Sequence, residues 1–76
     1  MNLENFIKGF ADQFDDTDES EINASTNFHE LEEWSSLISM SLIAFVRTEY
    51  GKKLTGNDIR ECETVEDLFN LIASKQ

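Results

Sequence analysis

The segment from Ser36 to Tyr50 is apolar on nearly every side, and this feature most limits the folds open to the chain. At about 100° per residue, one side of a helix collects a sufficient core face. Its members are Ser39, Leu42, Ile43, Val46 and Tyr50. Roughly opposite lie Leu37, Met40, Ser41 and Ala44, and a third apolar strip between the two groups holds Ile38 and Phe45. A helix that is apolar all round should be buried all round, and a chain of 76 residues can hardly surround it.

We therefore expect part of the side that carries Leu37, Met40 and Ala44 to be exposed and to meet a partner. The alternative is that the loop of residues 15–35 folds over this side. Its apolar side chains are Ile22, Phe28 and Trp34.

Other apolar residues recur at helical spacing elsewhere in the chain. One stripe predicts a helix over residues 3–14 with Asn2 as a possible cap: Leu3, Phe6, Ile7, Phe10 and Phe14. Another predicts a helix over residues 64–74 that opens on an approximate capping box: Val65, Leu68, Phe69 and Ile72. Residues 57–62 predict one or two helical turns, and residues 15–30 a long polar loop. No segment alternates with period two, so we expect an all-α fold, a small four-helix bundle with three main helices and a short third helix in one domain over residues 1–76.

The charge of the chain limits its partners. Six basic residues face 16 acidic ones, a net charge of −10, which argues against nucleic acid or an anionic membrane surface. Basic protein surfaces are the better complement. The start of the chain, with Glu4 and Asp12, lacks the pattern of a signal peptide, and no run reaches the ~20 apolar residues of a membrane span. Cys62 is the one cysteine, so no disulfide can form within the chain and we expect a reducing compartment, the cytoplasm. We also expect a monomer.

Catalytic chemistry has little support in the sequence. His29 is the one histidine, and no third group completes a hydrolytic triad with it and a serine, so a solvent-facing or capping role is expected. The acid-rich segment from Asp16 fails as a calcium loop because Glu21 replaces the required glycine and Asn27 the terminal glutamate. We expect a protein that is not an enzyme and holds no metal.

Two serines begin the apolar helix. Ser35 suits an N-cap, whose hydroxyl accepts a bond from an early backbone N–H. Ser36 follows at the helix N-terminus, where unpaired N–H groups and the positive end of the helix dipole favour a phosphate. A serine that another enzyme modifies needs no base in its own chain.

These residues resemble a known family, the acyl carrier proteins, over essentially the whole chain. The likeness lies in Ser36-Leu37 at the head of a long helix, the acids before it, the short third helix and the closing Thr-Val-Glu-Asp-Leu segment. The family's motif is Asp-Ser-Leu, whose serine carries 4′-phosphopantetheine. The resemblance implies that Ser36, with Ser35 as runner-up, receives this group from coenzyme A through a phosphopantetheinyl transferase.

The resemblance also implies a function. The arm's thiol would hold acyl groups as thioesters for acyl-transferring and acyl-modifying enzymes of fatty-acid or related biosynthesis. The docking residues that it implies are Leu37, Met40, Ser41, Ala44, Glu32, Glu33 and Ile59, the last also at the rim of an acyl pocket. A polyketide or an aminoacyl or peptidyl cargo stays open, as does an unmodified acidic interaction module.

The chain departs from the family pattern near the serine. Ser35 stands where the motif has aspartate, and Ser41 and Arg47 stand where acids are common. Recognition would then rely on acids outside the middle of the helix. They are Glu30, Glu32, Glu33, Glu49, Asp58 and Glu61.

Overall fold

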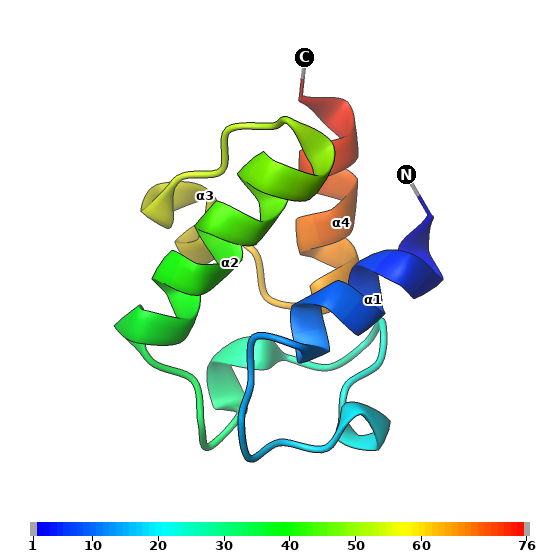
Figure 1. Ribbon diagram of the computed structural model, residues 1–76, viewed down its shortest axis with the longest axis vertical. Coiled ribbons are helices and arrows are strands. Elements are labelled where there is room, and N and C mark those ends of the chain that lie inside the picture. Colours follow the sequence, from blue (N-terminus) through cyan, green and yellow to red (C-terminus); the bar gives the residue numbers. More distant parts are fainter. Residues whose placement is uncertain (1, 76) are drawn as a thin grey trace.

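The computed structural model describes residues 2–75, which form a bundle of four helices (Figure 1). They are α1 (Leu3–Ala11), α2 (Ser36–Tyr50), α3 (Gly56–Glu61) and α4 (Val65–Ser74). Two single 3₁₀ turns, η1 (Glu19–Glu21) and η2 (Phe28–Glu30), lie in the connection between α1 and α2. Within the described residues the only β feature is one isolated bridge between Asn27 and Thr64. The predicted all-α fold is confirmed.

The first helix is shorter than predicted. Asn2 caps it as expected, accepting a bond from the N–H of Asn5 at 3.2 Å, but α1 ends at Ala11 and not at residue 14. The chain then tightens into two overlapping 3₁₀-type turns, in which the N–H groups of Gln13 and Phe14 donate to carbonyls three residues back. These turns keep Phe14 on the core side, where it is 6% exposed.

The other helix ends follow the predicted signals. Ser35 caps α2, and Gly51 ends it in the left-handed conformation at φ 65° and ψ 22°. Thr64 and Asp67 form a full capping box at the start of α4. The shorter aspartate thus serves where glutamate or glutamine is usual.

The long connection between α1 and α2 is fixed by the core and by α4. Ile22 and Phe28 are both buried in the core and hold the loop there. The carbonyls of Ala24 and Thr26 accept bonds from two N–H groups at the start of α4. These two N–H groups have no intrahelical acceptor, so the loop satisfies them and is held against α4 at the same time.

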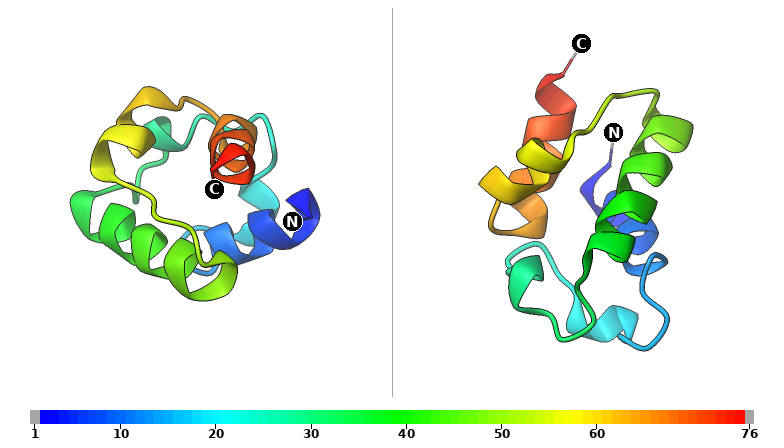
Figure 2. Two further views of the ribbon diagram at one scale, coloured as in Figure 1. Left: turned by 90° about the horizontal axis from the view of Figure 1, so that it is seen from above. Right: turned by 90° about the vertical axis from the view of Figure 1, so that its left-hand side faces the viewer.

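The molecule measures 32 × 23 × 20 Å, and its two longer connections lie at opposite ends of the long axis. The connection of residues 12–35 closes one end of the long axis, and α2 starts there (Figures 1 and 2). The turn from α2 into α3 lies at the opposite end. No helix among the described residues has the length and apolar content that a membrane crossing requires.

Candidate functional site

The start of α2 places two serines in different roles. Ser35 has extended backbone angles, and its hydroxyl accepts a bond from the N–H of Ile38 at 3.3 Å. Ser36 is the first residue inside the helix and is exposed. Its hydroxyl makes no hydrogen bond within residues 2–75, so it is free to be esterified, whereas that of Ser35 is already used.

One face of α2 is open to solvent along its whole length. We call it the exposed α2 strip; it consists of Ser36, Leu37, Met40, Ala44, Arg47 and Thr48. Leu37 is 72% exposed and Met40 67%, and they are the large exposed apolar side chains of the described chain. Ser41 is half-buried at the edge of the strip. The expected exposure of Leu37, Met40 and Ala44 is thereby confirmed.

The alternative, a loop folded over this strip, is wrong. The apolar side chains of the loop point into the bundle instead. Trp34 packs on Phe14 and Phe28, with ring centroids 6.3 and 4.9 Å away. The core face of α2 also needs a correction, because Ile38 is only 8% exposed and belongs to the core with Leu42 and Val46.

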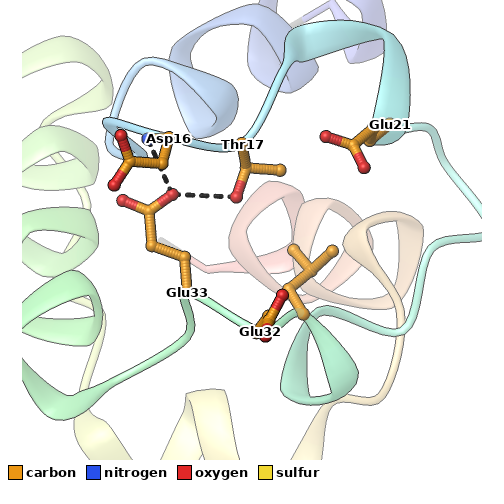
Figure 3. Close-up of a pocket in the computed structure, with 6 residues that line it drawn as sticks. Asp16, Thr17, Glu21, Glu32 and Glu33 are labelled. Carbon is orange, nitrogen blue, oxygen red and sulfur yellow. Dashed lines mark hydrogen bonds between the residues drawn. The ribbon is translucent and has the colours of Figure 1, made fainter.

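Glu33 connects the loop to the segment that precedes α2 (Figure 3). One carboxylate oxygen accepts the N–H of Asp15 at 2.7 Å. The other accepts the N–H of Asp16 at 2.9 Å and the hydroxyl of Thr17 at 2.8 Å. Desolvation alone raises the pKa of Glu33, but these bonds to its ionised form outweigh it and the pKa is lowered. Both oxygens are occupied, so a basic partner would have to compete with the loop for this carboxylate.

The hollow beside Glu33 has a volume of about 440 Å³ and an acidic lining (Figure 3). The residues around it are Asp16, Thr17, Glu21, Leu31, Glu32 and Glu33. Across residues 2–75, no group of three or more histidine, cysteine, aspartate or glutamate side chains is placed to hold a metal ion.

The remaining acids differ in their availability. Glu30, Glu32, Glu49 and Glu61 are exposed. Asp58 is engaged instead: Lys75 pairs with it at 2.9 Å, and the N–H of Thr55 donates to it at 3.1 Å. The bond from Lys75, together with those from Thr55, lowers the pKa of Asp58 against the opposing effect of desolvation.

Ile59 does not lie on the surface. It is 2% exposed and packs in the core, so its expected contribution to a docking surface needs a correction. It is nevertheless one of the residues that line a hollow of about 280 Å³ between the start of α2 and α3. The other lining residues are His29, Trp34, Ser39, Gly56 and Arg60.

His29 holds η2 against the end of α3. Its Nε2 lies 3.1 Å from the carbonyl oxygen of Ile59 and 2.8 Å from that of Cys62. Two carbonyls can only accept, so Nε2 carries the proton and donates to both. The capping role expected of this histidine is confirmed, although it caps a helix 30 residues further along the chain.

Two roles were missed at the level of sequence. The donors to Glu33 are mainly backbone N–H groups 17 and 18 residues away, and no residue pattern announces them. The second role is that of Arg47, which lies on the same face of α2 as Met40. The spacing of seven residues between them puts both on one helix face and could have shown this.

The start of α2 fits a phosphate ester. The helix supplies no carbonyl for the N–H groups of Ser36 and Leu37, and the N-terminal end of the helix dipole favours negative charge. The cap at Ser35 fixes the backbone, and Ser36 itself is exposed. A substituent at this hydroxyl would extend into solvent without displacing any part of the core.

Comparison with known proteins gives one finding. The family model described as the phosphopantetheine attachment site matches residues 7–72. Neither the comparison with curated proteins nor the comparison with solved structures gave a match. Members of this family bind 4′-phosphopantetheine covalently, interact with the transferase and with biosynthetic enzymes, and carry groups without catalysing reactions. The unmodified interaction module therefore loses its support, and the chain belongs to the family of phosphopantetheine-binding carrier proteins.

Proposed function

We propose that Ser36 is the attachment residue and that the loaded chain is an acyl carrier protein. The observation that carries this proposal is the exposed, uncommitted hydroxyl of Ser36 at the capped start of α2. The neighbouring serine is a poorer candidate because its hydroxyl already caps the helix at Ile38.

The attachment joins the Ser36 hydroxyl oxygen to a phosphorus atom of coenzyme A. The Ser36 O–P bond forms, the P–O bond to the adenosine bisphosphate half breaks, and the serine proton passes to a base on the transferase. When bound, the group supplies a thiol that carries cargo as a thioester. The chain's own residues hold the phosphate end still: Ser35 fixes the first turn, and the free N–H groups of that turn face the new negative charge.

The cargo that we propose is a fatty acyl chain. The hollow of about 280 Å³ between α2 and α3 supports this, because Ser39 in its lining lies one helical turn from Ser36 and the apolar residues Trp34 and Ile59 also line it. A polyketide or an aminoacyl or peptidyl group remains the alternative. Mass spectrometry of the protein isolated from its source with its cargo attached distinguishes these groups.

The docking surface that we propose is the exposed α2 strip. Leu37, Met40 and Ala44 would contact the partner's apolar surface, with Ser41 at the edge. Glu32 would meet basic side chains of the acyl-transferring and acyl-modifying enzymes, and Glu33 would do so in competition with the loop. The net charge of −10 favours such partners and disfavours self-association, so we propose a monomer. The free buried thiol of Cys62 is consistent with the cytoplasm.

The test compares two single serine variants. The protein is incubated with coenzyme A and a broad-specificity phosphopantetheinyl transferase, and its mass is measured. Ser36→Ala is expected to gain no phosphopantetheine. Ser35→Ala should still gain it while losing about 1 kcal/mol of stability with its cap. A modified Ser36→Ala protein, or an unmodified wild-type protein, would refute the assignment.

A further inference from the structure

The exposed α2 strip carries no acid. In a chain with 16 acidic residues and a net charge of −10, the one charged residue on this strip is basic, Arg47. The acids near the strip lie off it, among them Glu30 and Glu32 before α2 and Glu49 near its end. The face that displays Ser36 is thus locally apolar and positive on an otherwise negative molecule.

Arg47 is aligned with the serine. At about 100° per residue, Met40 lies about 40° and Arg47 about 20° from Ser36 around the helix. At 1.5 Å per residue, the 11 residues from Ser36 to Arg47 span about 16 Å. Met40 lies between them, so serine, exposed apolar side chain and cation follow one another along a single line.

The cation is available for a partner. The one ion pair among residues 2–75 joins Lys75 to Asp58, so no carboxylate of the described chain neutralises Arg47. Arg47 is exposed and borders a shallow hollow of about 180 Å³ together with Gly51, Lys52 and Lys53. Three of the chain's six basic residues therefore gather at this end of α2.

The phosphopantetheinyl transferase is the partner that must cover this line. It has to bring the Ser36 hydroxyl itself into its active site, where the bond to the phosphorus atom of coenzyme A forms, whereas later enzymes reach the cargo through the arm. A standard interface covers about 800 Å² on each partner, or roughly 30 Å across, and the whole molecule is 32 Å long. A transferase seated over Ser36 with such an interface reaches about 15 Å to each side and so brings its edge close to Arg47.

We propose that the transferase for this chain presents an apolar recess to Leu37 and Met40 and an acidic side chain to Arg47, about 16 Å along the helix from the reacting serine. Basic side chains of the transferase would be confined to the flank that meets Glu30 and Glu32. This inference rests on the proposed attachment at Ser36. It adds a specific charge pattern on the partner, and with it a means of selecting this carrier over one that has an acid at the same place.

The experiment measures the initial rate of phosphopantetheine transfer by the transferase of the source organism, with coenzyme A and the full chain. Arg47→Glu is expected to lower kcat/KM about tenfold, because like charges then face each other. Arg47→Gln should lower it about two- to fivefold, through loss of one exposed pair. The matched control is Lys8→Glu, which makes the same change in net charge at an exposed position of α1 and should alter the rate less than about twofold.

Salt and folding measurements complete the test. The difference between wild type and Arg47→Glu should shrink at about 0.5 M salt, where the Debye length falls below 5 Å. Melting temperatures show whether each variant is folded, and Arg47→Gln serves if Arg47→Glu is not. Equal effects of Arg47→Glu and Lys8→Glu, or a difference that salt leaves unchanged, would overturn the inference. Attachment at Ser36 would still be supported in that case if the wild-type protein is modified and Ser36→Ala is not. An unmodified wild-type protein would instead overturn the proposed function and the inference with it.

Discussion

Met40 and Leu42 are two residues apart on α2, and their substitution should separate docking from folding. Met40 is 67% exposed and Leu42 is fully buried. Full burial of a methionine side chain contributes about 1.5–3 kcal/mol. The one-third already covered therefore stabilises the fold by about 0.5–1 kcal/mol, and the exposed two-thirds leave about 1–2 kcal/mol for a partner.

Met40→Gln tests the contribution of the exposed part of Met40 to binding of a partner. Glutamine keeps the length and the helix propensity of methionine and adds no charge. Binding of an acyl-transferring enzyme that covers Met40 should weaken about 5- to 30-fold, the equivalent of 1–2 kcal/mol. The free energy of unfolding should fall by less than about 1 kcal/mol, or at most some 4–8 °C in melting temperature for a domain of this size.

Leu42→Ala is the control on the buried side. A fully buried leucine replaced by alanine costs about 2–5 kcal/mol, a large part of the stability of a small domain. Titration calorimetry with the phosphopantetheinylated protein and thermal unfolding provide the two readouts. If Met40→Gln binds as wild type does, or if it lowers the melting temperature as much as Leu42→Ala, the placement of Met40 on a docking surface is refuted.

Two further substitutions test the packing and the loop. Gly9→Ala should destabilise the fold by about 1–3 kcal/mol, since the added Cβ would clash with the Phe45 ring. Gly56→Ala meets nothing within 4 Å and should stabilise the fold by up to about 1 kcal/mol. If urea unfolding shows that both variants change the free energy of unfolding in the same direction, this expectation is contradicted. Because the folded-state pKa of Glu33 is lowered, its contribution is present above its ordinary value of 4.5 and is lost as pH falls through the folded pKa. Glu33→Gln should therefore be less stable than wild type at pH 7 and lose less stability on acidification below about pH 4.5; parallel curves would contradict this.

Helical spacing predicted the helices because three segments repeat apolar residues at that period. Spacing could not place the end of α1, because Phe14 reaches the core equally well from a helix or from the two 3₁₀-type turns that the chain adopts. For α2 the difficulty was the opposite. When a helix is apolar all round, the positions of its apolar residues do not show which side faces the core, so only the packing shows that Ile38 faces inward.

Ile59 shows the limit for short helices. The six residues of α3 carry no repeated stripe that separates an inner from an outer side. The inward direction comes from long-range contacts: the His29 ring at the end of α3 and the Lys75 ammonium group beside Asp58. Neither contact is a pattern in the sequence, since the partners are 30 and 17 positions from Ile59 and Asp58.

The loop before α2 explains how an exposed serine can also have a fixed position. A polar connection between residues 12 and 35 would by itself leave Ser36 at the end of a mobile segment. Ile22 and Phe28 anchor this connection in the core. Glu33, three positions before Ser36, accepts hydrogen bonds from the backbone N–H groups of Asp15 and Asp16 near the start of the connection. Loss of these anchors would change where the hydroxyl is presented without touching the strip beside it. With the proposed attachment at Ser36, the motion that a carrier needs can then reside in the attached arm, while the proposed docking surface stays fixed.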